Sequence, residues 1–530
     1  MKLMVTDIRI SAKDGVDELK EKVSKLLGIK DSDFHKFKIV KEAIDARKKP
    51  DISRVYSVLL ELPKTSRYRK CRQVREFAEE KNQPIEPGHK IMSARPVIVG
   101  SGPAGLFAAL TLAAQGYRPL VLERGQCVEK RNAAIETYWK TGMLDTECNV
   151  QFGEGGAGTF SDGKLTTRIN DRRCEKVLQQ FYEAGASEDI LYKAKPHIGS
   201  DVLRKVVANM RARLIEMGGE IRFGAKVTSL IIRNGRAVGV VVDGGTEIEA
   251  GVVVLAIGHS ARDTFSSLLK NGIYMEQKPF SIGVRIEHPQ EMINSIQYGS
   301  EGIAAELGAA DYQLFCKTGD RTAYTFCMCP GGVVVAAASE KDTIVTNGMS
   351  YYARDRENAN SAFVVSVGPG DYGSNNALAG VEFQREWEKK AYILGGGGGA
   401  APVQRLEDFI SGRMTTAFGR VKPSYTGNTS FADLNGCLPD YVTSAMKTAV
   451  PFFDNKLKGF GLKDAVLTGV ETRTSSPVRM TRGAAFEAEG ISGLYPTGEG
   501  AGYAGGIVSA AVDGIRIAEQ IILTYSPLER

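Results

Sequence analysis

The sequence predicts an α/β fold of three units: an N-terminal α+β module, a discontinuous domain with a parallel sheet, and an α+β domain inserted into it. Two strand–turn–helix segments, one after Arg95 and one near the C-terminus, predict the discontinuous domain. The 530 residues exceed what one hydrophobic core usually supports, so several units are expected. The expected segments are 1–94, 95–280, 281–469 and 470–530.

Residues 1–94 have the pattern of a basic α+β module without catalytic motifs. The stretch 64–94 is basic and then helical in pattern, and it ends in NQPIEPGHK, a Pro/Gly-punctuated sequence typical of a domain boundary. The other expected elements are a strand at 3–10, an amphipathic helix at 15–27, and strands at 37–46 and 55–62.

Residue 95 begins a β-turn-α-β unit, made of the strand RPVIVG, a glycine-rich turn, the helix GLFAALTLAAQGY and the strand PLVLERG. Residues 201–217 then predict a helix, and 221–258 predict short strands broken by NG, GG and AG turns. Signals between 264 and 470 are weak, apart from the strand GGVVVAAAS and five glycines at 395–399. The segment GLYPTGEGAGYAGGIVSAAVDGIRIAEQIIL is again strand, turn and helix.

The turn GSGPAG fits the G-x-G-x-x-G fingerprint of a dinucleotide-binding domain. Gly100 permits the tight turn, Gly102 lets the backbone approach a pyrophosphate, and Gly105 permits close contact of helix and sheet. The helix N-terminus then offers free N–H groups to the diphosphate. Glu123, at the end of the second strand, is placed to accept hydrogen bonds from the adenosine ribose.

The C-terminal glycine segment distinguishes FAD from NAD. A strand delivers Glu499, and several glycines then precede a long helix. Such a segment can place a carboxylate on the ribityl chain and a helix N-terminus against the flavin pyrimidine. An enzyme that binds only NAD has no need of it.

The motifs RPVIVGSGPAGLFAAL, LERG, VVLAIG and GLYPTGEGAGYAGG resemble the FAD superfamily typified by glutathione reductase, in its branch with a single dinucleotide domain. NVQFGEGGAGTFSDGKL, IGHSARDTF, CMCPGG, NGMS and ETRTSSPVR resemble one family within it, the predicted FAD-dependent dehydrogenases of unassigned substrate. The resemblance covers nearly the whole chain. It implies a Rossmann-like FAD-binding domain and bound FAD, and it implies no particular substrate.

The resemblance also implies positions for the cofactor contacts. The fingerprint would meet the pyrophosphate, Glu123 the ribose, a second glycine loop at 153–164 the flavin, and Glu499 the ribityl region, where many relatives carry Asp. Val227 is a candidate for backbone contact to adenine. The expected cofactor-binding residues are Gly100, Gly102, Pro103, Ala104, Gly105, Glu123, Arg124, Gly155, Gly156, Gly158, Thr159, Lys164, Val227, Gly258, Gly498, Glu499, Gly505, Gly506 and Ile507.

Candidate catalytic residues lie in three places. His259 and Arg262 follow a predicted strand and suit a general acid or base and an anion clamp, or a structural hydrogen-bonding role. Arg473, with Arg479 and Arg482, suits the grip of a carboxylate or phosphate, or a contact between domains.

Cys327 and Cys329 form a third candidate site. They are either thiols beside the flavin or small hydrophobes in a buried strand-to-turn segment, and the second interpretation is preferred. Their CxC spacing differs from that of flavin disulfide reductases. No His, Cys or Asp cluster has the spacing of a metal site.

Composition and charge restrict the partners. The net charge is +6, and residues 1–90 carry 22 basic and 15 acidic residues, so the excess lies in the N-terminal module. This is either a solvated basic face, the preferred interpretation, or a surface for nucleic acid. Eight cysteines without CxxC pairs, and the absence of an export signal or a clean apolar span, predict a reduced, cytoplasmic protein without membrane contact.

We therefore expect an FAD-dependent oxidoreductase that transfers a hydride or two electrons between flavin and a small, anionic molecule. There is no second strand–GxGxxG–helix unit, so NAD(P)H would have to reach the flavin without a domain of its own. Two alternatives remain open. The chain could modify RNA or another macromolecule through its basic module, or hold flavin without turnover.

Overall fold

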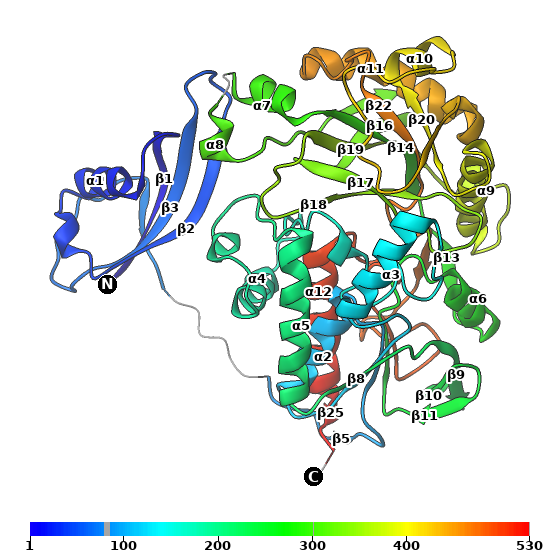
Figure 1. Cartoon of the computed structure of the whole chain (residues 1–530). Helices are drawn as coiled ribbons and strands as arrows, with labels where there is room; N and C mark the ends of the chain where they lie inside the picture. The colour runs from blue at the N-terminus through cyan, green and yellow to red at the C-terminus, as the bar shows by residue number, and fades with distance from the viewer. Residues whose placement is uncertain (79–84, 300–301, 529–530) are drawn as a thin grey trace.

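The computed structural model describes residues 1–78, 85–299 and 302–528. It is an α/β protein in which an N-terminal module stands beside two larger bodies, a lower one with a parallel sheet and an upper one built around a mixed sheet (Figure 1). The expected fold class, a Rossmann-like domain interrupted by an inserted domain, is confirmed. Within the described residues, no helix is long and apolar enough to cross a membrane.

The N-terminal module is a four-stranded antiparallel sheet covered by one helix. Helix α1 (Val16–Leu27) packs onto it through Leu19, Val23 and Leu27, spaced three or four residues apart on one face. The strands are β1 (Lys2–Ser11), β2 (Lys36–Asp45), β3 (Ser53–Glu61) and β4 (Val74–Glu76), in the order β2-β3-β1-β4.

The helical pattern expected within 64–94 is wrong for the described part of that stretch. Residues 64–78 form no helix, and β4 adds to the sheet edge, where Val5 of β1 pairs with Val74. Sheet pairing outweighs the local helical propensity here. Residues 79–84, on which part of the prediction falls, lie outside the described residues. After them, β5 (Lys90–Ile91) pairs with β25 (Tyr525–Ser526) at the C-terminal end.

The lower body contains a five-stranded parallel sheet in the order β24-β12-β6-β7-β8. Four of the short strands are wholly buried, because helices cover the sheet, and the edge strand β8 is partly exposed. Their bounds are β6 (Val97–Val99), β7 (Leu120–Glu123), β8 (Glu220–Phe223), β12 (Val253–Leu255) and β24 (Leu494–Pro496).

Three helices pack side by side on this sheet (Figure 1). They are α2 (Pro103–Ala113), α5 (Ser200–Glu216) and α12 (Ile507–Thr524). Helices α2 and α12 approach so closely that a β-carbon at Gly514 would lie 2.1 Å from the carbonyl oxygen of Ala104. The C-terminal segment is therefore an integral part of the domain that begins near residue 95.

The remaining elements of the lower body surround this core. The sheet β11-β10-β9 comprises β9 (Val227–Arg233), β10 (Arg236–Val242) and β11 (Thr246–Glu249). The additional helices are α3 (Val128–Thr141), α4 (Arg173–Glu183) and α6 (Arg262–Lys270).

The upper body is built on a seven-stranded sheet in the order β15-β16-β19-β14-β22-β20-β21. Its strands are β14 (Phe280–Pro289), β15 (Phe315–Thr318), β16 (Arg321–Cys329), β19 (Asn358–Val367), β20 (Ala401–Arg405), β21 (Thr429–Phe431) and β22 (Val466–Glu471). Two antiparallel two-stranded sheets pair β17 (Gly332–Ala336) with β18 (Thr346–Ser350), and β13 (Met275–Gln277) with β23 (Val478–Met480). The helices are α7 (Gln290–Tyr298), α8 (Ala304–Leu307), α9 (Ala379–Leu394), α10 (Leu406–Ser411) and α11 (Asp440–Lys456).

Candidate functional site

Three glycine-rich segments that are far apart in the sequence converge at one end of the parallel sheet. A β-carbon at Gly156 would lie 3.1 Å from the Cα of Gly102, so the first two segments touch through their backbones. A β-carbon at Gly498 would lie 2.7 Å from Cβ of Ala104, which brings in the third. The segments are 100–105, 153–158 and 498–507.

The turn before α2 has the geometry that the fingerprint predicts. Gly100 has φ +102°, and a β-carbon there would lie 2.3 Å from the carbonyl oxygen of Ala256. A β-carbon at Gly105 would lie 1.9 Å from the carbonyl oxygen of Gly100. Helix α2 begins with Pro103 and has no side-chain cap, so its first N–H groups are left for an anionic ligand.

Glu123 is buried and is saturated with hydrogen bonds from the protein itself. Its Oε2 accepts from the N–H and Oγ of Ser101, at 2.9 and 2.8 Å. Its Oε1 accepts from the N–H groups of Gly125 and Gly153, at 2.9 and 3.0 Å. The carboxylate therefore joins the first glycine turn to the second loop, besides any contact it makes to a ribose.

Arg124, predicted to bind the cofactor, is held by acidic neighbours. Its guanidinium donates to both carboxylate oxygens of Asp263 at 2.9 Å and to Glu147 at 2.8 Å, and it stacks over Phe152. Val227 is buried at the start of β9, where its backbone pairs with Val242.

Arg131 organises the second glycine loop, although it is not among the residues predicted from the sequence. This fully buried side chain of α3 donates to the backbone carbonyls of residues 149, 150, 153, 154 and 156, at 2.6–3.2 Å. Burial lowers the pKa of Arg131 to about 10. Nothing in its sequence context, an ordinary amphipathic helix, marks this role.

The second loop also contains Glu154, a buried carboxyl with one unpartnered oxygen. Its Oε2 accepts from the Val128 N–H and from Arg211, at 2.8 and 3.0 Å, while Oε1 has no partner among the described residues. Burial raises the pKa of Glu154 to about 7, although these two donors oppose the shift.

The rest of the second loop touches the C-terminal segment. Thr159 is buried and its hydroxyl lies 3.4 Å from the carbonyl oxygen of Glu154. A β-carbon at Gly155 would lie 2.2 Å from Oγ1 of Thr159, and one at Gly158 would lie 2.9 Å from Ile507 at the start of α12. Only glycine fits at either position without displacing these neighbours.

The third segment leaves space around its backbone. β-Carbons built at Gly258, Gly505 and Gly506 would meet no described atom within 4 Å. Helix α12 begins there without a side-chain cap. Its first N–H groups thus face an open cradle, as those of α2 do.

Glu499 lies within this third segment, and no described group donates a hydrogen bond to its carboxylate. Burial raises the pKa of Glu499 to about 7, opposed by the positive charge of Lys278. A half-buried carboxyl without a donor at this point fits an acceptor for the hydroxyl groups of a ligand.

These features fit an FAD-like dinucleotide. Two helix N-termini without side-chain caps and a backbone cradle of glycines provide for a diphosphate. The half-buried carboxyl of Glu499, which has no donor among the described residues, provides for hydroxyl groups. Gly395–Gly399 does not provide a second such site, because it follows the end of α9 and precedes β20. It is a helix terminus followed by a strand, the reverse of the fingerprint order.

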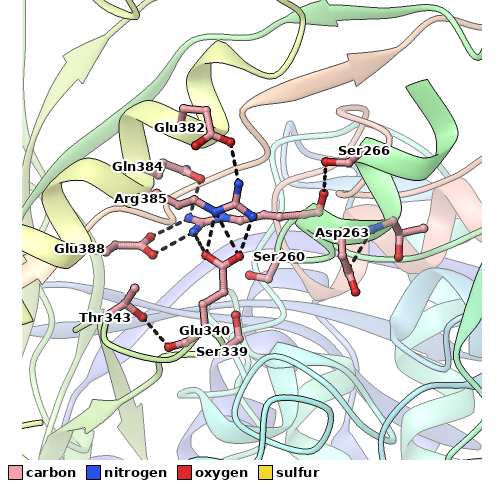
Figure 2. Close-up of polar contacts among 12 residues, drawn as sticks. Ser260, Asp263, Ser266, Ser339, Glu340, Thr343, Glu382, Gln384, Arg385 and Glu388 are labelled. Atoms are coloured by element: carbon pink, nitrogen blue, oxygen red, sulfur yellow. Dashed lines mark hydrogen bonds and ion pairs between the residues drawn. The ribbon is translucent and has the colours of Figure 1, made fainter. Parts of the chain in front are cut away.

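Two predicted catalytic residues, Arg262 and Arg473, belong to a buried ion-pair network between the two bodies. Figure 2 shows the acceptors Glu388, Glu340 and Gln384 of this network. Both guanidinium groups bind the carboxylate of Glu388 on α9, at 2.7–3.0 Å. Arg262 also pairs with Glu340 at 2.6 Å. Their charges are compensated within the protein, which favours a structural role over an anion clamp.

His259 is adjacent to this network. Its Nδ1 lies 3.0 Å from the hydroxyl of Ser260, which also accepts a hydrogen bond from Arg473. Burial, together with the positive charges of Arg473 and Arg262, lowers the pKa of His259 to about 3. The ring is therefore neutral at physiological pH.

Arg482, from the predicted cluster of Arg473, Arg479 and Arg482, is also paired with an acid. Arg482 forms a bidentate ion pair with Asp513 on α12, at 2.6 and 2.9 Å. Arg479 differs, because it donates only to the carbonyl of Gly502 and stacks against Tyr503. Of the three, Arg479 keeps an uncompensated charge beside the C-terminal glycine segment.

Cys327 and Cys329 lie at the end of β16, in a cluster of charged groups. Lys164 of the second glycine loop contacts the carbonyl oxygen of Met328. Arg285, fully buried on β14, donates to the carbonyl oxygen of Cys327 at 2.9 Å and forms a bidentate ion pair with Glu471. The charged residues 285 and 287 within the apolar strand FSIGVRIEHP are a sequence signal that could have revealed this cluster.

Comparison with known protein families gives three matches. Residues 279–474 match the family described as FAD-dependent protein, C-terminal domain-like. Residues 98–128 match the NAD(P)-binding Rossmann-like domain, and residues 1–61 match a domain of unknown function.

Among known proteins, an uncharacterized protein of Clostridium beijerinckii is 50% identical over 527 residues, covering 98% of this chain and 99% of that protein. Protein FixC of Escherichia coli K12 is 30% identical over 220 residues, which cover 40% of this chain and 47% of FixC. Glycine oxidase from Geobacillus kaustophilus is a similar solved structure, with 10% identity, 83% of this chain and 97% of that chain covered, and a TM-score of 0.36. That score is too low to support a conclusion about function.

Proposed function

We propose a function from the premise that this chain belongs to a family of FAD-dependent oxidoreductases, which it shares with the Clostridium beijerinckii protein. FAD is its cofactor, as the sequence predicted. Our proposal is that the chain is a dehydrogenase-like enzyme of the glutathione-reductase-like superfamily. It transfers a hydride or two electrons between the flavin and a small, anionic molecule.

The chain's own residues would hold and orient the cofactor. FAD, when bound, supplies the two-electron chemistry. The N–H groups at the starts of α2 and α12 would neutralise the diphosphate and the flavin pyrimidine, and Glu499 would accept from the ribityl hydroxyls. Arg131 would keep the second loop rigid through its backbone carbonyls.

The observation that supports an anionic substrate is a group of three cations that form no salt bridge in the described part of the chain. They are Lys164, Lys278 and Arg479, here called the free-cation group, and of these Lys278 lies near enough to Glu499 for the two charges to interact. They border the second and third glycine segments, and the charges of Lys278 and Arg479 are close enough to influence each other. Burial lowers the pKa of Lys278, and a bound anion would restore it.

The proposed anion site therefore differs from the one predicted from the sequence, which used Arg262 and Arg473. Arg262 and Arg473 face Glu388, so a substrate carboxylate would have to displace a buried acid to reach them. Among the residues that the structure describes, Lys278 instead donates only to the Ser475 hydroxyl, at 3.3 Å. It can turn to a substrate at little cost.

The test is anaerobic reduction of the flavin by a panel of small carboxylates and phosphates and their neutral analogues. We expect reduction by anions alone, and Lys278→Gln should raise the half-saturating concentration about tenfold or more, the loss of one charge-assisted hydrogen bond. Lys389→Gln, on an exposed lysine of α9, is the matched control. Equal reduction by neutral analogues, or an unchanged Lys278→Gln variant, would contradict the proposal.

The electron partner is tested in the same apparatus with NADH and NADPH. We propose that a pyridine nucleotide reaches the flavin without a domain of its own, and a rapid loss of flavin absorbance with either nucleotide would support this. If neither nucleotide reduces the flavin, the substrate itself would be the reductant. The eight free cysteines support the proposal of a cytoplasmic location.

A further inference from the structure

The segment Cys327–Cys329 has an unusual backbone at the end of β16. Phe326 pairs with Ala362 and Cys329 with Asn360, so the register shifts between them and forms a bulge. Cys327 lies in this bulge with φ +43°, a left-handed conformation that non-glycine residues rarely adopt. Such conformations concentrate at functional sites, where the surrounding structure maintains them.

The surroundings maintain the bulge by binding its carbonyl groups. Arg285 donates to the carbonyl oxygen of Cys327 at 2.9 Å, and Lys164 contacts that of Met328. The Cys329 thiol donates to the carbonyl oxygen of Cys327 at 3.3 Å, which folds the two cysteines toward each other. Two cations therefore hold the backbone carbonyl groups of the segment that carries both thiols.

The two thiols differ in exposure and acidity. Cys329 is fully buried, whereas Cys327 is half-buried. The neighbouring Cys329 thiol and the positive charges of Lys164 and Arg285 hold the pKa of Cys327 below that of an ordinary thiol, although burial opposes the shift. The neighbouring Cys327 and burial raise the pKa of Cys329. At neutral pH the pair is one thiolate and one thiol.

We propose that Cys327 and Cys329 form a redox-active dithiol–disulfide couple that reduces small disulfide compounds beside the flavin. This activity goes beyond the proposed oxidation or reduction of an anionic molecule, and it requires no reduction of the flavin to be observed. The half-buried Cys327 is the attacking residue and the buried Cys329 the resolving residue. The bulge brings them together although only Met328 separates them.

The reaction balances as two exchanges. The Cys327 thiolate attacks a disulfide RSSR, which forms the Cys327–SR bond and releases RS⁻. The Cys329 thiol then loses its proton as its sulfur attacks Cys327, so the Cys327–Cys329 bond forms and RSH leaves. The cysteine pair has lost two electrons, and the disulfide compound has gained them as RS⁻ and RSH.

The experiment exposes the full-length flavoprotein to glutathione buffers of increasing oxidation, followed by alkylation and peptide mass spectrometry. We expect the Cys327–Cys329 peptide to convert from the dialkylated form to an internal disulfide. Cys329→Ser should instead accumulate glutathione on Cys327, and Cys327→Ser should form neither product. Cys437→Ser, at a buried thiol of another segment, should behave as the parent.

A second readout is the pH dependence of Cys327 alkylation. Half-maximal reactivity should fall below the ordinary thiol range in the parent and move upward in Cys329→Ala, which has no hydrogen-bond donor at this position. Dialkylation of both cysteines in excess oxidised glutathione, in a protein that retains its flavin spectrum, would overturn the proposal. So would half-maximal Cys327 reactivity near pH 8–9, the ordinary thiol range. Neither outcome depends on whether an anion reduces the flavin.

Discussion

Glu123, which is buried, and Glu499, which is half-buried, are acids at opposite ends of the proposed cofactor site, and they differ in their hydrogen bonding. Glu123 accepts four hydrogen bonds from the protein, whereas none is donated to Glu499 by the described residues. The first acid therefore builds the site, and the second is available to the ligand. The sequence assigned both to FAD from their positions alone, and only the structure separates these roles.

The variant Glu123→Ala tests the first role. It leaves the N–H groups of Ser101, Gly125 and Gly153 buried without an acceptor, each at a cost of about 1–3 kcal/mol. We expect weaker FAD retention together with a loss of about 3 kcal/mol or more in the free energy of unfolding of the apoprotein. An unchanged denaturation midpoint would contradict this structural role.

Glu499 predicts a pH dependence of the apoprotein. Its pKa is about 7 in the folded chain and near 4.5 when exposed, so the folded state binds the proton more tightly. This contribution to stability is present below pH 4.5 and is lost as the pH rises through 7. Glu499→Gln should therefore flatten the fall in melting temperature between pH 5 and pH 8. Glu216→Gln, at an exposed position of α5, should leave the slope of the parent.

At the scale of elements, α3 supports the second glycine loop through Arg131. Arg131→Lys keeps the charge but cannot reach five carbonyl groups, so several buried acceptors lose their donor. We expect a loss of about 3–5 kcal/mol in the free energy of unfolding and a lower affinity for FAD by fluorescence titration. Arg213→Lys on exposed α5 is the control, and equal behaviour of the two variants would contradict the role.

The elements that the sequence predicted are those with a local signal. Hydrophobic patterns and glycine turns were enough to predict α2, α12 and the strands around them, because these elements are buried in the core of the parallel-sheet domain. The sheet edge at β4 was missed because its residues favour a helix, and pairing with β1 decides their conformation. The hydrogen-bond partners of Arg131, Arg262 and Arg473 lie at least 18 residues away in the sequence, so they leave no local pattern.

At the scale of the whole molecule, Glu388 connects the two larger bodies. It lies on α9 of the upper body, is fully buried, and binds Arg262 of α6 and Arg473. Figure 2 shows it pointing into the contact together with Glu340 and Gln384. Glu388→Gln leaves two arginines with a neutral partner, so we expect a loss of about 3–5 kcal/mol in the free energy of unfolding. Calorimetry should then show two separated transitions, and a single unshifted transition would contradict this coupling.

The central claim is that three distant glycine segments form one FAD site. The most direct test is the ratio of bound FAD to protein after reconstitution, measured by visible absorbance, in the parent chain and in Gly156→Val. The parent should bind FAD in an equimolar ratio, and the variant should lose it, because a valine there would collide with the backbone of Gly102. A parent chain without flavin absorbance after FAD is added, or a Gly156→Val variant that retains full occupancy, would contradict the account.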